Sequence, residues 1–218
     1  MSAFDGVRVL DLGQIYNGPY CGLLLGLLGA DVIKVEPPGG ERLRYRSTDE
    51  VETHEFTMLN SNKRSIVLDL KSAAGRSVFM DLIAQVDVLI ENFAPGALDR
   101  MGFPAASLLA HNPRLVIASG KGYGSSGPYA NMSAMDITVQ AMSGVIASTG
   151  FPDGSPTKAG PAFADIMGGI HLFGGIAAAL YQREKTGRGQ VVEVSMHDTI
   201  YPALASVLGA IYNDPTRV

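Results

Sequence analysis

The feature that most constrains the fold is a regular alternation of short apolar runs with longer segments of helical periodicity. Runs such as "VRVLDL", "DVIKVE" and "GQVVEVSM" are rich in valine, isoleucine and leucine and have the length of strands. We expect strands at residues 7–12, 31–36, 64–70, 87–93, 112–120 and 189–196. We expect helices at residues 19–30 and 72–85, one from about Met135, and one that Asp165 would begin.

Strands that are apolar almost throughout and are separated by helices indicate a mostly parallel sheet with helices on both faces. The expected fold class is therefore α/β with Rossmann-like order. Ligands of such folds bind beyond the carboxyl ends of the strands, in the loops that follow them. In this chain those loops are "GQIYNGP", "PPGGERLR", "KSAAG", "ENFAPGALDR" and "GKGYGSSGPYA".

The last residues have a different character from the rest of the chain. An apolar helix begins to leave the sheet and is followed by "NDPTRV", whose turn residues and proline are typical of a linker. We therefore expect one large domain over residues 1–205. Residues 206–218 would be a helix end and the start of a linker towards a small domain absent from this chain.

Charge and composition exclude several classes of partner. The chain has 21 acidic and 17 basic residues, so no basic field would attract nucleic acid or an anionic membrane. The start "MSAFDGVRVL" lacks the features of a signal peptide, and "CGLLLGLLGA" is too short to span a bilayer. Cys21 is the single cysteine, which suits a reducing compartment, and we interpret it as a buried small hydrophobe. We expect a cytoplasmic protein without nucleic-acid or membrane partners.

The loop after the first strand does not bind a dinucleotide in the usual way. It contains Gly13 and Gly18, but their spacing differs from G-x-G-x-x-G and Pro19 follows. Glu36 stands where an acid would bind ribose, yet without those glycines we expect a solvated strand end. The pattern of a phosphate-binding P-loop is also missing from "GKGYGSSGPYA". The sequence thus disfavours hydride transfer.

Metal and serine chemistry have equally little support. The four histidines are scattered and none has ligand spacing to cysteine or carboxylate, so we expect no metal site. No G-x-S-x-G elbow is present, although spacing alone does not exclude a histidine-assisted serine.

Asp165 is the only carboxylate in the apolar run "PAFADIMGGIHLFGGIAAAL". It could cap the following helix, which is the common role of an aspartate before an apolar run. It could instead be a nucleophile in a poorly solvated pocket, where the neighbouring small residues make room for a bulky substrate. The residues alone favour the cap.

Six scattered cations could hold an anionic ligand if the fold brings them to one edge of the sheet. They are Arg42, Arg44, Lys63, Lys71, Arg100 and Lys121. Ordinary surface charge is the simpler interpretation of the same residues.

Five segments together resemble the class III CoA-transferase family, to which formyl-CoA transferase and carnitine CoA-transferase belong. They are "VRVLDLGQIYNGPYCGLLLGLLGADVIKVEPPGG", "NKRSIVLDLKSAAG", "DVLIENFAPGALDRMGF", "NPRLVIASGKGYG" and "GRGQVVEVSMHD". The resemblance runs from about Val7 to Asp198 in the family's order.

The resemblance implies an enzyme that transfers coenzyme A from an acyl-CoA donor to a carboxylic acid acceptor. Asp165, in "AFADIMGGIHL", matches the aspartate that carries the acyl group, and this reverses the preference for a cap. The resemblance also implies CoA contacts at Tyr16, Asn17, Leu68, Asp69, Lys71, Asn92, Phe93, Arg100, Met135 and Asp136. CoA would be a substrate, no cofactor would be tightly bound, and the protein would be an interlocked homodimer.

Some positions differ from formyl-CoA transferase. Pro37 replaces a cation, for which Arg42 or Arg44 could substitute, Ser133 replaces a lysine, and Tyr16 replaces a glutamine. The family also contains 2-methylacyl-CoA racemases, but this chain has Met135 where the racemase histidine would be. A racemase-type isomerase and a non-catalytic CoA-binding fragment or subunit remain the alternatives.

Overall fold

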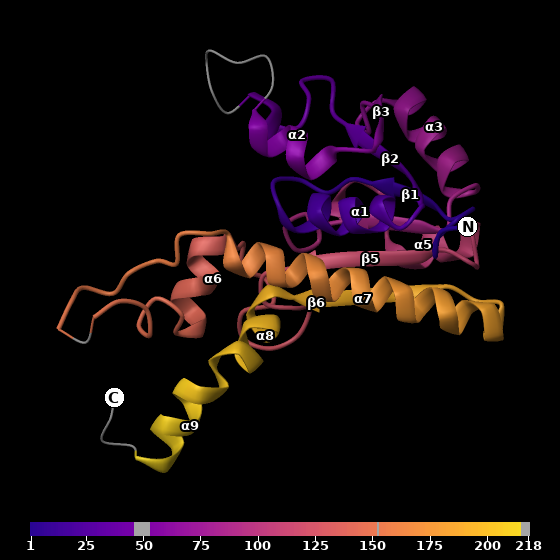
Figure 1. Cartoon of the computed structure of the whole chain (residues 1–218). Helices are drawn as coiled ribbons and strands as arrows, with labels where there is room; N and C mark the ends of the chain where they lie inside the picture. Colours follow the sequence, from indigo (N-terminus) through magenta and orange to yellow (C-terminus); the bar gives the residue numbers. More distant parts are fainter. Residues whose placement is uncertain (46–52, 152, 215–218) are drawn as a thin grey trace.

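The computed structural model describes residues 1–45, 53–151 and 153–214, which form a six-stranded parallel sheet surrounded by helices (Figure 1). The strands are β1 (Arg8–Asp11), β2 (Asp31–Glu36), β3 (Arg64–Val67), β4 (Val88–Glu91), β5 (Val116–Lys121) and β6 (Gln190–Ser195). Their order is β3-β2-β1-β4-β5-β6, and every pairing between neighbours is parallel. The predicted Rossmann-like α/β fold is confirmed.

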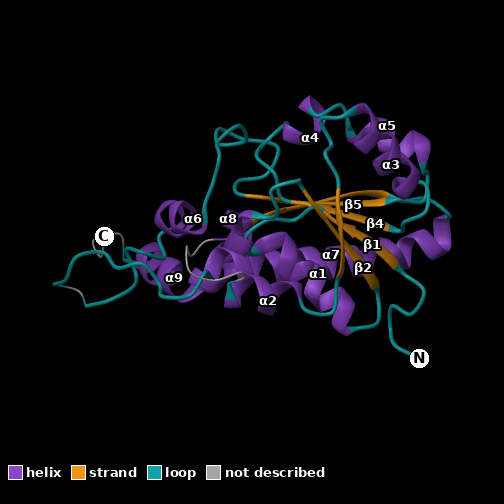
Figure 2. Ribbon diagram, turned by 90° about the horizontal axis from the view of Figure 1, so that it is seen from above, coloured by secondary structure: helices purple, strands orange, loops and turns teal. Residues whose placement is uncertain are grey.

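Helices cover both faces of the sheet (Figure 2). One face carries α1 (Asn17–Leu27), α2 (His54–Asn60) and α7 (Phe163–Thr186), and the other carries α3 (Ala73–Ile83), α4 (Ala97–Arg100) and α5 (Ala105–His111). Beyond the sheet lie α6 (Asp136–Ser143), α8 (Met196–Ile200) and α9 (Ala205–Asn213).

Each central strand sends alternate side chains to two separate cores. Val9 of β1 belongs to the core that includes residues of α1 and α7. Leu10, the next residue, belongs to the core that includes Phe79 of α3. Both strand residues are fully buried, which explains why these strands are apolar rather than alternating in sequence. Cys21 lies in the first of these cores, as predicted.

The strand β3 ends earlier than expected because polar side chains bind the backbone that follows it. The segment after β3 turns at Asp69, whose Oδ1 accepts a hydrogen bond from Lys71 N at 3.0 Å. Ser72 then caps α3 by accepting from Gly75 N. By contrast, α1 begins two residues earlier than predicted, because Pro19 fits the first turn, where its missing N–H is not needed.

The paired glycines of α7 serve helix packing. A Cβ at Gly168 would collide with Asn17, and one at Gly169 would lie 2.8 Å from the Asn17 carbonyl oxygen. A Cβ at Gly175 would lie 2.7 Å from the side chain of Val192. At Gly168, Gly169 and Gly175 the interpretation that small residues make room for a substrate is therefore wrong, because α1 and β6 occupy that space.

Although α7 is long and apolar enough to cross a membrane, its contacts are those of a core helix. Its buried residues, among them Leu172 and Ile176, pack with residues of β1, β4 and β5. The predicted helix end and linker at 206–218 correspond to most of α9 and to residues 215–218, which lie outside the described residues.

Candidate functional site

A cavity of about 430 Å³ lies at the carboxyl ends of β1, β4 and β5. The strands β1 and β4 are the neighbours at which the order of the sheet reverses, which is the usual place for a ligand in this fold. The walls of this cavity come from the loops after β1, β4 and β5, from the segment before α6, and from the first turn of α7. The lining residues that were predicted as site residues are Asn17, Asn92, Phe93, Met135 and Asp165.

A second cavity of about 470 Å³ adjoins the first, and both are lined by Ile15, Arg42 and Met135. Tyr16 and Asp136 line this second cavity. Seven of the eleven predicted residues thus lie around two adjoining cavities, whose sizes suit a small-molecule ligand.

The other four predicted residues lie outside both cavities. Leu68 is half-buried and packs against the core under α3, while Asp69 and Lys71 are exposed beyond the edge strand β3. Arg100 is exposed on α4, and its Nη1 donates to the carbonyl oxygen of Pro95, which lines the first cavity.

Asp165 is not the cap of α7. The helix begins at Phe163, which places Asp165 in the first turn. The cap comes instead from Asp136, whose Oδ1 accepts hydrogen bonds from Ala164 N at 2.8 Å and Asp165 N at 3.2 Å. Asp136 is in turn fixed by Gln140, a fully buried residue that donates to Asp136 Oδ2 at 2.6 Å. The backbone of Asp165 is therefore held while its carboxylate is left to face the cavity.

The electrostatic environment of Asp165 is unusual for a carboxylate in a first helical turn. Burial, together with the nearby charge of Asp136, raises the pKa of Asp165 to about 7. Within the described residues its carboxylate forms no hydrogen bond or ion pair that would oppose this shift. A carboxylate that is weakly solvated and lacks a counter-charge is a better nucleophile than a paired one.

The raised pKa predicts how Asp165→Asn changes stability with pH. The folded chain holds the proton up to about pH 7, whereas an unfolded aspartate loses it near 4, so wild-type stability falls as the pH rises through this window. At pH 8 we expect the Asn variant to be more stable than wild type by about 1–3 kcal/mol, a range reduced for partial exposure of the side chain. Urea unfolding at pH 5 and pH 8 measures this difference.

The exposed carboxylate Asp81 on α3 provides the control, because Asp81→Asn should change stability equally at both pH values. An Asp165→Asn variant that is less stable than wild type at pH 8 would contradict the raised pKa and indicate that ionised Asp165 stabilises the helix.

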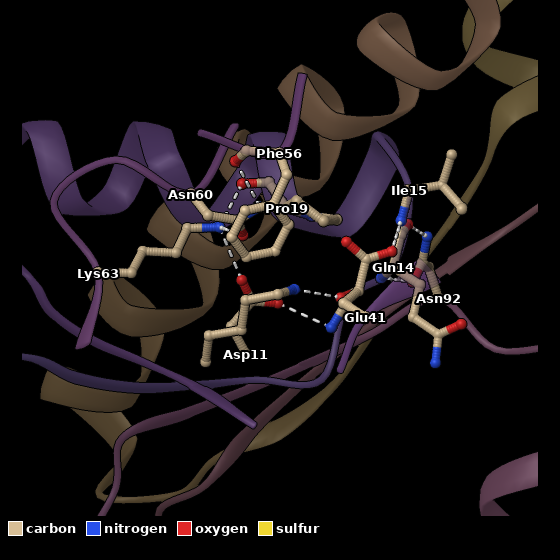
Figure 3. A network of polar contacts seen from close by, with 11 residues as sticks. Asp11, Gln14, Ile15, Pro19, Glu41, Phe56, Asn60, Lys63 and Asn92 are labelled. Atoms are coloured by element: carbon tan, nitrogen blue, oxygen red, sulfur yellow. Dashed lines mark hydrogen bonds and ion pairs between the residues drawn. The ribbon is translucent and has the colours of Figure 1, made fainter. Parts of the chain in front are cut away.

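Three of the six cations considered as phosphate ligands are engaged within the protein. Lys63 Nζ lies 2.8 Å from Asp11 Oδ2, and this buried pair lies between β1 and α1 (Figure 3). Lys121 Nζ lies 2.8 Å from Glu91 Oε1. Because these charges are compensated, they do not form an anion site. Arg42, which is exposed and lines both cavities, is better placed than Lys63 or Lys121 to meet a ligand anion.

The third engaged cation corrects the interpretation of Glu36. This residue is 2% exposed rather than solvated, and Arg44 Nη2 lies 2.7 Å from its Oε1. Burial alone would raise the pKa of Glu36, but hydrogen bonds from Arg44, Ser65 and the Glu41 amide outweigh it and lower the value to about 2. Glu36 therefore anchors the loop after β2.

Sequence reasoning missed Gln14, Ile15, Gly120 and Gly122, which also line the first cavity. Their loops were recognised as ligand-binding loops, but nothing in the residue types shows which backbone segments face inwards. The only local sign in the sequence is Ile15, a β-branched residue between polar neighbours in a predicted loop. The structure shows that its φ is 64°, which is left-handed.

No group of three or more histidine, cysteine, aspartate or glutamate side chains within residues 1–45, 53–151 and 153–214 could hold a metal ion.

Curated proteins that are similar to this chain in sequence are named as CoA-transferases. The chain is 47% identical over 198 residues to acetyl-CoA:oxalate CoA-transferase of Acetobacter aceti, covering 89% of this chain and 51% of that protein. It is 48% identical over 200 residues to formyl-CoA:oxalate CoA-transferase of Streptomyces avermitilis, covering 91% and 49%. The chain thus spans about half the length of these curated relatives.

A solved structure agrees with the sequence relatives. A CAIB/BAIF family protein from Brucella suis superimposes with a TM-score of 0.93 at 38% identity, covering 98% of this chain and 58% of that one. The model of CoA-transferase family III matches residues 4–214. The chain therefore belongs to CoA-transferase family III.

Proposed function

We propose that the whole protein transfers coenzyme A from an acyl-CoA thioester to a free carboxylic acid, with Asp165 as the nucleophile. The observation that carries this proposal is the Asp165 carboxylate, which lines a cavity at the switch point of the sheet, has no counter-charge among residues 1–45, 53–151 and 153–214, and has a pKa of about 7. Family membership and the names of the relatives supply the chemistry that such a carboxylate would perform.

The proposed reaction proceeds through Asp165 in four attacks. The carboxylate oxygen attacks the thioester carbonyl, the C–S bond breaks, and CoA leaves as a thiolate with a mixed anhydride on Asp165. The thiolate attacks the aspartyl carbonyl, releases the donor acid as a carboxylate and forms an aspartyl thioester. The acceptor carboxylate attacks this thioester and again releases the thiolate, which then attacks the acceptor carbonyl. The new acyl-CoA leaves, and Asp165 is regenerated as a carboxylate.

The residues around the nucleophile support this role. Asp136 and Gln140 hold its backbone, and the half-buried position of Asp165 limits the access of water to an anhydride. The long CoA molecule would supply binding energy at a distance from the reacting atoms, so that the thiolate stays close between steps. The proposed CoA contacts at the two cavities are Tyr16, Asn17, Asn92, Phe93, Met135 and Asp136.

The relatives suggest which substrates to test first. Both curated relatives named above use oxalate as the acceptor, with formyl-CoA or acetyl-CoA as the donor. The experiment that tests the function incubates the whole protein with either donor and oxalate, and follows oxalyl-CoA by chromatography. Hydroxylamine should attack the activated Asp165 carbonyl, displace CoA or the donor acid, and leave a hydroxamate on Asp165 that mass spectrometry identifies; failure to find any CoA transfer or any modified Asp165 would refute the proposal.

A racemase-type isomerase is the second candidate on family grounds, but no described feature favours it. Met135 lines the cavity where a histidine would be required, and it has no proton to exchange. Deuterium exchange at the α-carbon of a 2-methylacyl-CoA would distinguish the two reactions. We also propose that the whole protein is a cytoplasmic homodimer with interlocked subunits, and that it binds neither nucleic acid nor membrane.

We propose that the nucleotide end of CoA lies outside the cavities and contacts Leu68, Asp69, Lys71 and Arg100. Arg100→Ala should weaken CoA binding about tenfold, because a charge-assisted phosphate contact contributes roughly 1.5–3 kcal/mol. The loss should be larger at low salt, since the contact is exposed. Isothermal titration with CoA at two salt concentrations measures it.

Arg188→Ala is the matched control, because Arg188 is equally exposed but follows the carboxyl end of α7, remote from Asp165. Equal affinities of wild type and the Arg100 variant would exclude Arg100 from the CoA site.

A further inference from the structure

The loop after β1 is held by side chains from several other parts of the chain (Figure 3). Gly13 N donates to Asp11 Oδ1, and Lys34 Nζ donates to the Gly13 carbonyl oxygen, each at 2.7 Å. Asn92, in the loop after β4, binds Gln14 twice: its Oδ1 accepts from Gln14 N and its Nδ2 donates to Gln14 O, both at 2.8 Å. Both polar backbone groups of Gly13 and of Gln14 are therefore fixed.

Ile15 follows, and it has the conformation that most needs support. Its φ of 64° is left-handed, which is a genuine outlier for a β-branched residue and persists only where the surroundings enforce it. Ile15 N donates to Glu41 Oε1 at 3.0 Å, and the same oxygen accepts from Leu43 N at 3.1 Å. Figure 3 shows the Glu41 carboxylate directed at this part of the loop.

The burial of the Glu41 carboxylate is energetically unfavourable at this position. Glu41 is 2% exposed, and its Oε2 is buried without a hydrogen-bond partner in the described part of the chain. An unsatisfied buried carboxylate oxygen destabilises a fold, so its presence calls for another role of the residue. Its backbone is fixed as well, because Glu41 N donates to Glu36 Oε2 at 3.1 Å.

We propose that Glu41 is a positioning residue of the acyl-CoA site, which holds Ile15 in its left-handed conformation. This inference rests on the proposed function for the identity of the ligand. Ile15 lines both cavities, and the direction of the chain at this residue decides that Tyr16 faces the second cavity and Asn17 the first. Glu41 lines neither cavity, so it acts through the loop and does not touch the ligand.

The test is a double-mutant cycle between Glu41 and Ile15, read as CoA affinity in the whole protein. Glu41→Ala removes the acceptor and should weaken CoA binding about tenfold, because the ligand must then select the left-handed conformation from a mixture. Ile15→Gly makes that conformation accessible without help, since glycine adopts positive φ freely. In the Ile15→Gly background, Glu41→Ala should therefore cost less than about twofold.

Two further variants separate positioning from stability. Glu41→Gln keeps an acceptor for Ile15 N and should bind CoA within about threefold of wild type, whereas Glu41→Asp keeps the charge but shortens the reach and should resemble Glu41→Ala. The Asp variant also serves if Glu41→Ala does not fold. Asp81→Ala, which removes an exposed carboxylate on α3, should leave the affinity unchanged.

Three results would overturn the proposal. They are wild-type affinity in folded Glu41→Ala and Glu41→Asp, an equal loss on Glu41→Ala in both backgrounds, and rapid hydrogen exchange of the Ile15 amide in wild type. Hydrogen exchange needs no ligand, so it decides whether Glu41 holds the loop even if wild type fails to bind CoA. That failure would refute the proposed function separately.

Discussion

Asp165→Asn in the whole protein should abolish CoA transfer while leaving CoA binding within about twofold of wild type. The amide is nearly the same size as the carboxylate but cannot attack a thioester. The helix should not suffer, because Asp136 and not Asp165 accepts the first-turn hydrogen bonds. We expect a fall in turnover of at least about 10⁴-fold, as is usual when a covalent nucleophile is removed.

The measurement is the rate of acyl-CoA formation together with hydroxylamine trapping, and the purified variant must be checked by mass for deamidation back to aspartate. Asp81→Asn serves as the control for the preparation. The pKa of about 7 adds a second signature, because wild-type turnover should rise with pH through this value as Asp165 ionises. Transfer by the Asn variant at near wild-type rate would show that another residue carries the acyl group.

The second large effect is expected at the buried pair of Asp11 and Lys63. Both side chains are almost fully buried, and Lys34, another buried lysine, adds its charge to that of Lys63 near Asp11. Asp11→Ala removes the counter-charge and the acceptor of Gly13 N, and should cost about 3–5 kcal/mol of unfolding free energy. Urea unfolding at neutral pH measures the loss.

An exposed pair of the same kind provides a matched control. Arg64 Nη2 lies 2.6 Å from Asp31 Oδ2 on the surface of β2 and β3, and Asp31→Ala should cost less than about 1 kcal/mol. Equal losses at the two sites would mean that burial does not govern the Asp11 pair.

The same pair also predicts an acid dependence. Burial alone would raise the pKa of Asp11, but the charges of Lys63 and Lys34 outweigh it, so the folded-state pKa lies below the ordinary value. The stabilising contribution of the pair is therefore complete above about pH 4 and is lost as the pH falls through the folded-state value.

Most of the fold could be predicted because the spacing of apolar residues indicates where strands and helices lie and how long they are. The boundaries of β3 and α3 could not, because they depend on single side-chain hydrogen bonds made by Asp69 and Ser72. The role of Glu36 was misjudged for a similar reason, since Ser65 is distant in the sequence and the approach of Arg44 depends on the turn after β2.

The site was predictable only in part. Residue types alone left Asp165 between cap and nucleophile, and the family resemblance decided between them. No local pattern indicates that Asp136, 29 residues away, provides the cap instead. The loop 13–15 shows the same limit, because its conformation depends on Glu41 and Asn92, which reach it from the loops after β2 and β4.

The glycines of α7 determine which substitutions this helix can accept. The two pairs look alike in the sequence, but among the described residues Gly174 has no neighbouring atom within 4 Å of an added Cβ, whereas Gly168, Gly169 and Gly175 all do. Gly174→Ala should stabilise α7 by about 1 kcal/mol, because alanine has the higher helix propensity. At 168, 169 and 175 the same exchange would push α7 away from α1 or β6 and displace the turn that carries Asp165. Packing therefore constrains three of these glycines, although none of them lines either cavity, whereas no contact in the described part of the chain constrains Gly174.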